Sequence, residues 1–176
     1  MRKEFYLAVR ERLLSRFSPI KYVGLWNNNV EYIEQETGWP RPAVFVEFCA
    51  FRWDRVGQGG DGVSYASRGE VRFHIVTDSS EEMSCSDGSA ELSRLMLSEY
   101  LQASLYGLRG DWFGHVELVC SMTNHNHGEI IDDVEVYEVS FHRKVLRAEL
   151  PVRVPFRMEG ISVGGHGIVV EPPLVL

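Results

Sequence analysis

"PAVFVEFCAFRW" (42–53) is apolar on both of its alternate faces, and the predicted arrangement of the whole fold depends on this stretch. As one extended strand, it would point these side chains to one side of a sheet: Ala43, Phe45, Glu47, Cys49, Phe51 and Trp53. The other side would receive Val44, Val46, Phe48 and Ala50, with Arg52 at the end. Because a strand with one solvated face alternates apolar and polar residues, the stretch predicts a strand that is covered on both sides.

The composition is that of an ordinary globular protein. The chain has 176 residues, of which 44% are hydrophobic and 24% charged, and this length suits one domain with some additional chain. Cys49, Cys85 and Cys120 form no CxxC pair, so we expect reduced thiols in a cytosol. Charged residues at 10–12 interrupt the apolar N-terminus, which does not read as a signal peptide. No apolar stretch approaches the roughly 20 residues that span a bilayer, and no membrane contact is expected.

The charge balance is acidic. The formal net charge is −7, and Lys and Arg do not cluster along the sequence. Domains that bind DNA usually carry a stripe of basic residues, because the neutralisation of phosphates by Lys and Arg supplies most of the affinity. Sequence-specific binding of nucleic acid is therefore not expected.

Two stretches have the periodicity of amphipathic helices. The first, 2–17, has apolar residues at steps of four: Phe5, Val9, Leu13 and Phe17. Pro19 ends it, because proline disfavours the helical conformation at the preceding residue. The second, 90–108, has leucines at steps of three or four: Leu97, Leu101, Leu105 and Leu108. Gly107 lies near its end, where glycine readily terminates helices.

Extended segments fill most of the remaining chain. Strands are predicted at 20–26, 42–53, 70–78, 113–122 and 133–146, and 30–36 is either extended or a helical turn. In 70–78, Val71, Phe73 and Ile75 would share one face, with Glu70, Arg72 and His74 on the other. The polar, glycine-rich stretch 54–69 is interpreted as the broad, mobile loop of a long hairpin.

The order α-β-β-β-α-β-β predicts an α+β fold. Its natural form is a mainly antiparallel sheet with two helices packed on one face. Residues 1–146 are expected to form this single domain. Residues 147–176 contain too much proline and glycine for a regular helix, yet are too apolar for a disordered tail. We expect an extended C-terminal arm, packed on its own domain or on a neighbour.

Candidate chemistry is sparse. In "TNHNHGEIIDD" (123–133), His125 and His127, with Asp132 or Asp133, are residue types that bind zinc or iron. The surrounding Asn and Gly residues favour a solvated hairpin turn instead, so this metal site is a weak candidate. "GQGGDG" (57–62) lacks the Gly-Lys-Ser/Thr of a phosphate loop.

No catalytic group emerges from the remaining motifs. Cys49 lies in an apolar stretch and is interpreted as a small core residue. His74, which shares a predicted face with Arg72, is interpreted as a polar surface or interface residue. Neither an enzymatic activity nor a cofactor is expected.

The second apolar face of 42–53 needs a partner, because two helices cover only one face of a sheet. The C-terminal arm is one candidate for this cover, and another subunit is the alternative. Exposed aromatic patches usually mark an interface, so we favour a subunit interface formed by Phe45, Glu47, Phe51 and Trp53.

The order of these segments resembles the tail terminator, or tail completion, proteins of lambda-like long-tailed bacteriophages and prophages. The similarity covers residues 2 to about 146. It lies in the following segments: "KEFYLAVRERLLSRF", "IKYVGLWNNNVEYIEQE", the "PAVFVEF…W" strand, a glycine-rich loop, "VRFHIV", a helix ending in "LYGL", and a "VYEVSF" last strand. The arm after Arg147 is longer than in a minimal member of the family.

The resemblance implies a structural role without chemistry. Family members form a six-membered ring that caps the tail tube, stops its polymerisation and offers a surface to the head–tail connector protein. The expected locations are the host bacterial cytoplasm during assembly and then the head-proximal end of the virion tail. DNA would pass through the ring, and from the net charge alone we expect an acidic lumen that repels it.

The glycine-rich loop is the predicted contact with the tail-tube protein. Its candidate residues are Asp54, Arg55, Gln58, Asp61, Tyr65 and Arg68. Two alternatives stay open: a head–tail connector or other minor tail protein, and a metal-dependent enzyme that uses His125 and His127.

Overall fold

In a computed structural model, the chain forms an α+β unit, Met1–Leu146, and a second unit, Arg147–Leu176. The structure describes residues 1–15, 18–27, 38–59, 62–78, 88–124 and 130–146, all of them in the first unit. The described elements are α1 (Arg2–Leu13), β1 (Tyr22–Leu25), β2 (Ala43–Phe48), β3 (Arg52–Gly59), β4 (Gly62–Asp78), α3 (Ser89–Leu105), β5 (Phe113–Asn124) and β6 (Ile130–Leu146). The predicted α+β class is confirmed.

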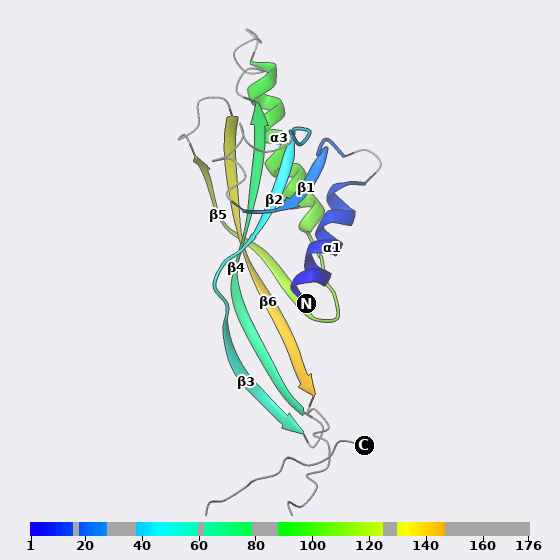
Figure 1. Ribbon diagram of the computed structural model, residues 1–176. Coiled ribbons are helices and arrows are strands. Elements are labelled where there is room, and N and C mark those ends of the chain that lie inside the picture. Colours follow the sequence, from blue (N-terminus) through cyan, green and yellow to red (C-terminus); the bar gives the residue numbers. More distant parts are fainter. Residues whose placement is uncertain (16–17, 28–37, 60–61, 79–87, 125–129, 147–176) are drawn as a thin grey trace, which may run out of the picture. The chain divides into compact units, whose positions relative to one another are not determined.

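The strands form one sheet in the order β1-β2-β4-β6-β5, with β3 beside β4 (Figure 1). Only β1 and β2 pair in parallel. β4 and β6 each have 17 residues and pair over their whole length, from Gly62↔Leu146 to Asp78↔Ile130. One half of β4 also pairs with β2, and the other half pairs with β3.

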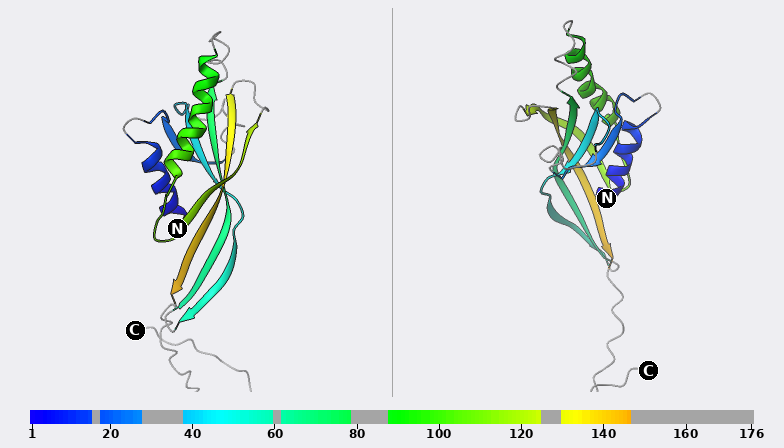
Figure 2. Two further views of the ribbon diagram at one scale, coloured as in Figure 1. Left: turned by 180° about the vertical axis from the view of Figure 1, so that it is seen from behind. Right: turned by 45° about the horizontal axis from the view of Figure 1, so that its top comes forward.

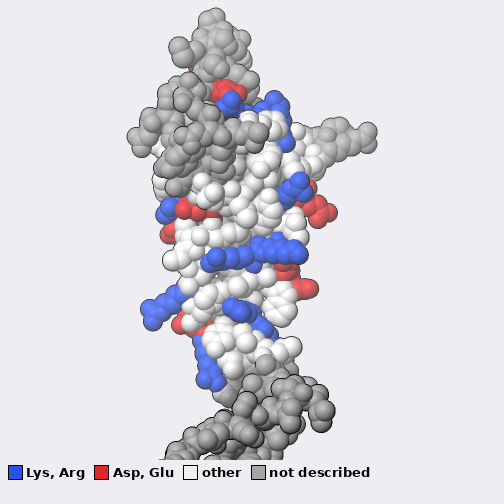
Figure 3. Space-filling model, viewed as in Figure 1, with Lys and Arg blue, Asp and Glu red and all other residues white. Residues whose placement is uncertain are grey.

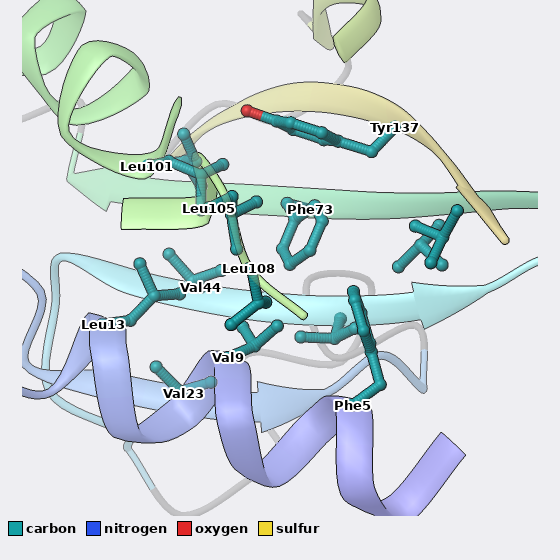
Figure 4. Packing of buried hydrophobic residues seen from close by; sticks show 14 of the residues in the cluster. Phe5, Val9, Leu13, Val23, Val44, Phe73, Leu101, Leu105, Leu108 and Tyr137 are labelled. Atoms are coloured by element: carbon teal, nitrogen blue, oxygen red, sulfur yellow. The ribbon is translucent and has the colours of Figure 1, made fainter. Parts of the chain in front are cut away.

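Both helices cover the same face of the sheet, as Figure 2 shows from two further directions. The apolar periodicity of each helix predicts its buried residues correctly: Phe5, Val9 and Leu13 in α1, and Leu97, Leu101 and Leu105 in α3. These side chains meet Val71, Phe73 and Ile75 of β4, which are also buried (Figure 4). Phe5 lies at the centre of an aromatic group, with ring centroids 5.1 Å from Phe113 and 5.6 Å from Phe141.

A smaller apolar cluster lies on the opposite face of the sheet. Its buried members are Ala43, Phe45, Val76 and Ile130. Trp26 and Trp39 pack over this cluster, and their rings meet the ring of Phe45 nearly edge-on, at centroid distances of 6.2 and 4.9 Å. The second apolar face of β2 is thus covered by tryptophans of the same chain.

The prediction of one strand over 42–53 is wrong, because the chain breaks between Phe48 and Arg52. Phe51 crosses at this break and packs on the backbone of Gly69, where a Cβ atom would collide with its ring. The Phe51 ring also meets Phe141 at 5.0 Å, on the helix-covered side. Phe45 therefore does not share a face with Phe51 and Trp53, and the sheet gains one strand over the predicted order.

The prediction of a mobile loop over 54–69 is also wrong. This stretch lies in β3 and β4, which pair from Arg52↔Arg68 to Gly59↔Gly62 with a bulge between Arg55 and Gly57. β3, Gly62–Arg68 of β4 and Ser140–Leu146 of β6 form a three-stranded projection that extends past the helices (Figure 1). We call this projection the β finger.

The remaining boundaries differ by a few residues. α1 ends at Leu13, and α3 ends at Leu105, where Gly107 adopts a φ of 65° that favours glycine. β5 is two residues longer than predicted and contains a bulge at His115, whose φ is 43°. Phe17 and the predicted extended segment 30–36 lie outside the described residues, as does the predicted arm 147–176.

Candidate functional site

The β finger carries an excess of basic side chains. Its basic residues are Arg52, Arg55, Arg68, Arg143 and Lys144, and Asp54 is the only acidic residue within its described strands. Figure 3 shows Lys and Arg side chains over these lower strands. Sequence inspection misses this cluster because 52–55, 68 and 143–144 are far apart in the chain and meet only through strand pairing.

Positive charge lies on both faces of the finger. Paired residues of neighbouring strands project to the same side of a sheet. Arg55, Tyr65 and Arg143 form one such row, on the face that continues the helix-covered side. Arg52 and Arg68 are paired on the opposite face, and Lys144, which pairs with Ser64, belongs to that face too.

Most of the predicted tail-tube contacts lie on the finger. Asp54, Arg55, Gln58 and Arg68 are exposed, Tyr65 is half-buried, and Asp61 lies outside the described residues. Arg55 donates a hydrogen bond to Gln58, and Arg68 lies 3.6 Å from a carboxylate oxygen of Glu138. The structure thus brings these side chains together on a regular hairpin in place of a loop.

The predicted interface residues are dispersed. Phe45 is only 1% exposed, under Trp26 and Trp39. Phe51 and Trp53 are half-buried and pack against the helix-covered core. Their place in an interface stays a prediction, and the intrachain cover of Phe45 leaves it almost no surface to offer a neighbour.

A buried polar cluster is centred on His74, and the prediction that this residue lies on the surface is wrong. His74 Nδ1 lies 3.1 and 3.2 Å from the two carboxylate oxygens of Asp132, which is 1% exposed. His74 Nε2 lies 3.3 Å from Glu47 Oε2. The Trp26 ring stacks on the imidazole, with centroids 3.6 Å apart and an interplanar angle of 5°.

The His74 cluster joins three strands, because Glu47, His74 and Asp132 belong to β2, β4 and β6. Glu47 also lies 3.6 Å from Arg72, so this predicted interface residue pairs within its own chain. The imidazole ring thus has a carboxylate neighbour at each of its two nitrogen atoms. Trp26, which directly follows β1, also belongs to this cluster. The neighbours of His74 in the sequence are charged and do not indicate this stacking partner.

Nucleophilic chemistry finds little support in this cluster. Cys49 follows Glu47 by two residues, but burial, with the nearby Glu47 carboxylate, raises the pKa of its thiol. A raised pKa disfavours the thiolate, which is the reactive form. No hydrogen bond joins Cys49 to His74 among the described residues. The geometry serves to hold strands together.

A second polar group lies between α3 and the sheet. Arg94 of α3 donates to both oxygens of Asp133 at 2.7 and 2.9 Å, and Thr123 donates to the same carboxylate at 2.6 Å. Tyr137 belongs to the same strand as Asp133, and its hydroxyl end points toward α3 (Figure 4). Burial, reinforced by the Glu135 carboxylate, raises the pKa of Tyr137.

The weak metal candidate gains no support from the described residues. His125 and His127 lie outside them, and Asp132 and Asp133 are engaged by His74 and Arg94. Within the described ranges, no three His, Cys, Asp or Glu side chains are arranged to hold a metal ion.

The charge distribution also changes the meaning of the net charge. The described residues contain as many Lys and Arg as Asp and Glu, so the formal −7 arises entirely in the ranges outside them. Three of the acidic residues of β6, Asp132, Asp133 and Glu135, are buried. The described surface is therefore not acidic, while the expected acidic lumen of a ring stays a prediction.

Comparison with known proteins adds no family assignment. No protein-family model matches the chain, and no curated protein is significantly similar to it. None of the helices in the described ranges has the length and hydropathy to cross a bilayer. The fold and the two clusters therefore carry the functional argument.

Proposed function

We propose that the protein is a structural component of a long-tailed phage virion, which caps the end of the tail tube as a hexameric ring. The ring stops tube polymerisation and joins the tail to the head. This proposal takes the sequence resemblance as its starting point. The α+β unit with two helices on one face of its sheet is compatible with it.

The observation that carries the proposal is the β finger. Within the described unit, its strands run beyond the helices and leave most side chains of β3 exposed. Such a projection contributes little to the core, where the buried residues of α1, α3 and the upper strands meet. A regular, solvent-exposed sheet on a rigid domain is suited to docking against another protein. We propose that the finger contacts the end of the tail tube.

Subunit contacts are assigned to the two ends of the strand order. Among the described strands, β1 and β5 each have a neighbour on one side only. Both expose large apolar side chains: Tyr22 and Leu25 on β1, and Val119 and Met122 on β5. Exposed edge strands readily pair with another chain. A contact between β5 of one subunit and β1 of the next is heterologous, and such contacts close into a ring when the rotation permits.

The first test is the mass of the protein in solution, by light scattering over a concentration series, alone and with its tail-tube protein. The proposal expects a particle near six times 20.1 kDa in at least one condition. Val119→Lys with Met122→Lys should abolish this particle. Leu92→Lys with Leu95→Lys, at equally exposed sites on α3, is the matched control and should retain it. A monomer in both conditions contradicts the ring.

The docking role of the finger needs a separate test. Gln58→Ala with Tyr65→Ala removes two predicted contacts from the finger without a change in charge. We expect the ring to persist and binding to tube ends, followed by co-sedimentation, to fall by about tenfold or more. Unchanged binding would remove the finger from the tube contact. Preferential binding to connector protein would instead support the connector alternative.

A further inference from the structure

The β finger concentrates positive charge that the rest of the described unit does not share. Lys and Arg equal Asp and Glu over all described residues, yet the described strands of the finger hold five basic side chains and one acidic side chain, Asp54. Part of this basic charge has no ion pair within the described residues. Arg68 has an ion pair with Glu138, whereas Arg52 and Arg143 form none with the described residues.

The pairing of Arg52 with Arg68 is unfavourable in isolation. The two residues are directly opposite on neighbouring strands, and like charges at such positions destabilise a sheet. Arg55 and Arg143 flank Tyr65 on the other face, about 10 Å apart for two strand spacings. An anionic ligand would relieve the repulsion on both faces.

We propose that the β finger binds the phosphate backbone of duplex DNA without reading its sequence. A single sheet with its side chains is about 10 Å thick, and the major groove is about 12 Å wide. A finger that enters this groove edge-first brings both faces against walls of phosphate. Among the described residues, no further strand pairs with the outer edge of β3 or with β6 beyond His142.

Duplex DNA fits the finger better than an acidic protein does. A folded partner presents its carboxylates on one surface, whereas the finger is basic on both faces. Four of the five basic residues are arginines, whose planar guanidinium binds phosphate oxygens in pairs. Tyr65 and Trp53 lie on the same face as Arg55 and Arg143, and tyrosine hydroxyls also contact phosphates.

Over the described residues Lys and Arg equal Asp and Glu, so the remainder of the described unit opposes this binding only through local acidic groups. Charges are screened over a Debye length of about 8 Å. β4 continues nine residues beyond Val71, from Glu70 to Gly62, which corresponds to roughly 30 Å of strand. The tip of the finger thus lies well beyond one Debye length from the covered half of the sheet, whereas Arg68 at its base is paired with Glu138. Neither the ring nor the tube protein enters this inference, so it stands or fails independently of the proposed function.

The test uses the full chain and a labelled 30-base-pair duplex of mixed sequence, with binding followed by fluorescence anisotropy. We expect the logarithm of the binding constant to fall with the logarithm of salt concentration, with a slope of about −3 for three to four phosphate contacts. Arg55→Glu with Arg143→Glu should weaken binding at least tenfold. A duplex of different sequence should bind within about twofold.

The matched control is Arg10→Glu with Lys21→Glu, which changes the net charge equally at exposed sites outside the finger. It should weaken binding less than threefold, and circular dichroism should show both double variants folded. Equal losses in the two variants would overturn the proposal, as would no binding at 25 mM salt. If poly-glutamate displaces the duplex as effectively per charge as unlabelled DNA, the ligand is an acidic protein and the DNA proposal is wrong.

Discussion

The two halves of β4 and β6 are made from the same continuous strands but have opposite surroundings. From Val71 to Asp78, β4 is mostly buried between the helix-covered core and the cluster under Trp26 and Trp39. From Gly62 to Glu70, the same strand lies mostly in the finger, where Gly62 and Ser67 are buried and the other residues are exposed or half-buried. The hydrogen-bonded register does not change between the halves.

The comparison shows that the interactions that form the strands differ from those that stabilise the domain. Backbone pairing alone extends the sheet into the finger, while apolar burial is concentrated at the other end. Substitutions in the covered half should therefore change the free energy of unfolding, and substitutions in the finger should change binding. The following predictions test that division, in decreasing order of expected effect.

Phe5→Ala should have the largest effect on stability. Phe5 is completely buried and meets the rings of Phe48, Phe73, Phe113 and Phe141. Removal of a buried phenyl ring leaves a cavity and costs about 4 kcal/mol. Urea denaturation measures this loss. Val56→Ala in the finger, where Val56 is 61% exposed, is the control and should change stability by less than about 0.5 kcal/mol. A comparable loss at Val56 would contradict the division.

Asp132→Asn should cost about 3 kcal/mol, because it replaces one carboxylate oxygen of a buried pair with an amide group that His74 Nδ1 and its surroundings do not accommodate. A double-mutant cycle with His74→Phe separates the pair from the rest of the site. The phenyl ring keeps the stack on Trp26, so His74→Phe mainly removes the contact with Asp132. The double variant should therefore lose less stability than the sum of the two single losses. Strict additivity would mean that the two side chains do not interact.

Gly69→Ala should destabilise the protein by about 2 kcal/mol, since the new methyl group collides with the Phe51 ring. Thermal unfolding measures the effect. Phe51→Ala provides space for the methyl group, and in that background the same substitution should cost less than about 0.5 kcal/mol. A persistent loss there would assign the cost to the backbone of β4.

Tyr137→Phe should stabilise the protein by about 1 kcal/mol at pH 7. The Tyr137 side chain is buried, and its hydroxyl has no hydrogen-bond partner among the described residues, so its removal abolishes a desolvation cost. The folded-state pKa of Tyr137 is raised above the ordinary 10.0. Stability from this group is therefore complete below pH 10 and decreases as pH rises above it.

The pH dependence of the free energy of unfolding tests the same prediction. Between pH 10 and 11, wild-type stability should fall by up to about 1.4 kcal/mol more than that of Tyr137→Phe. Guanidinium denaturation at the two pH values compares them. Parallel pH profiles would show that Tyr137 ionises equally in both states.

Local pattern was sufficient for the helices but not for the path of the strands. The apolar steps of α1 and α3 identify their buried residues because helix periodicity is a local property. The break at 49–51 depends on Gly69, whose bare Cα accepts the Phe51 ring from a distant part of the chain. "CAFRW" (49–53) remains strand-like in composition, so no local signal reveals the crossing.

The same reason explains the candidate site. The glycines of this stretch favour a loop by local rules, yet Gly57 and Gly59 pair with β4, and Gly62 pairs with the end of β6. His74 has charged neighbours in the sequence, whereas its burial comes from Trp26, and its bond to Asp132 comes from β6. Basic residues of the finger form a cluster only after these strands pair.

The unbroken register of β4 and β6 also has a mechanical consequence. A load applied along the axis to β6 at the tip, and opposed at the far end of β4, acts on all 17 paired positions in parallel, so their hydrogen bonds resist it in shear and do not open one after another. The far end of the same ladder contacts α3 through the Arg94–Asp133 pair. A pull at the tip is thus transmitted along the paired strands to the helical layer, and the finger acts as a stiff mechanical link.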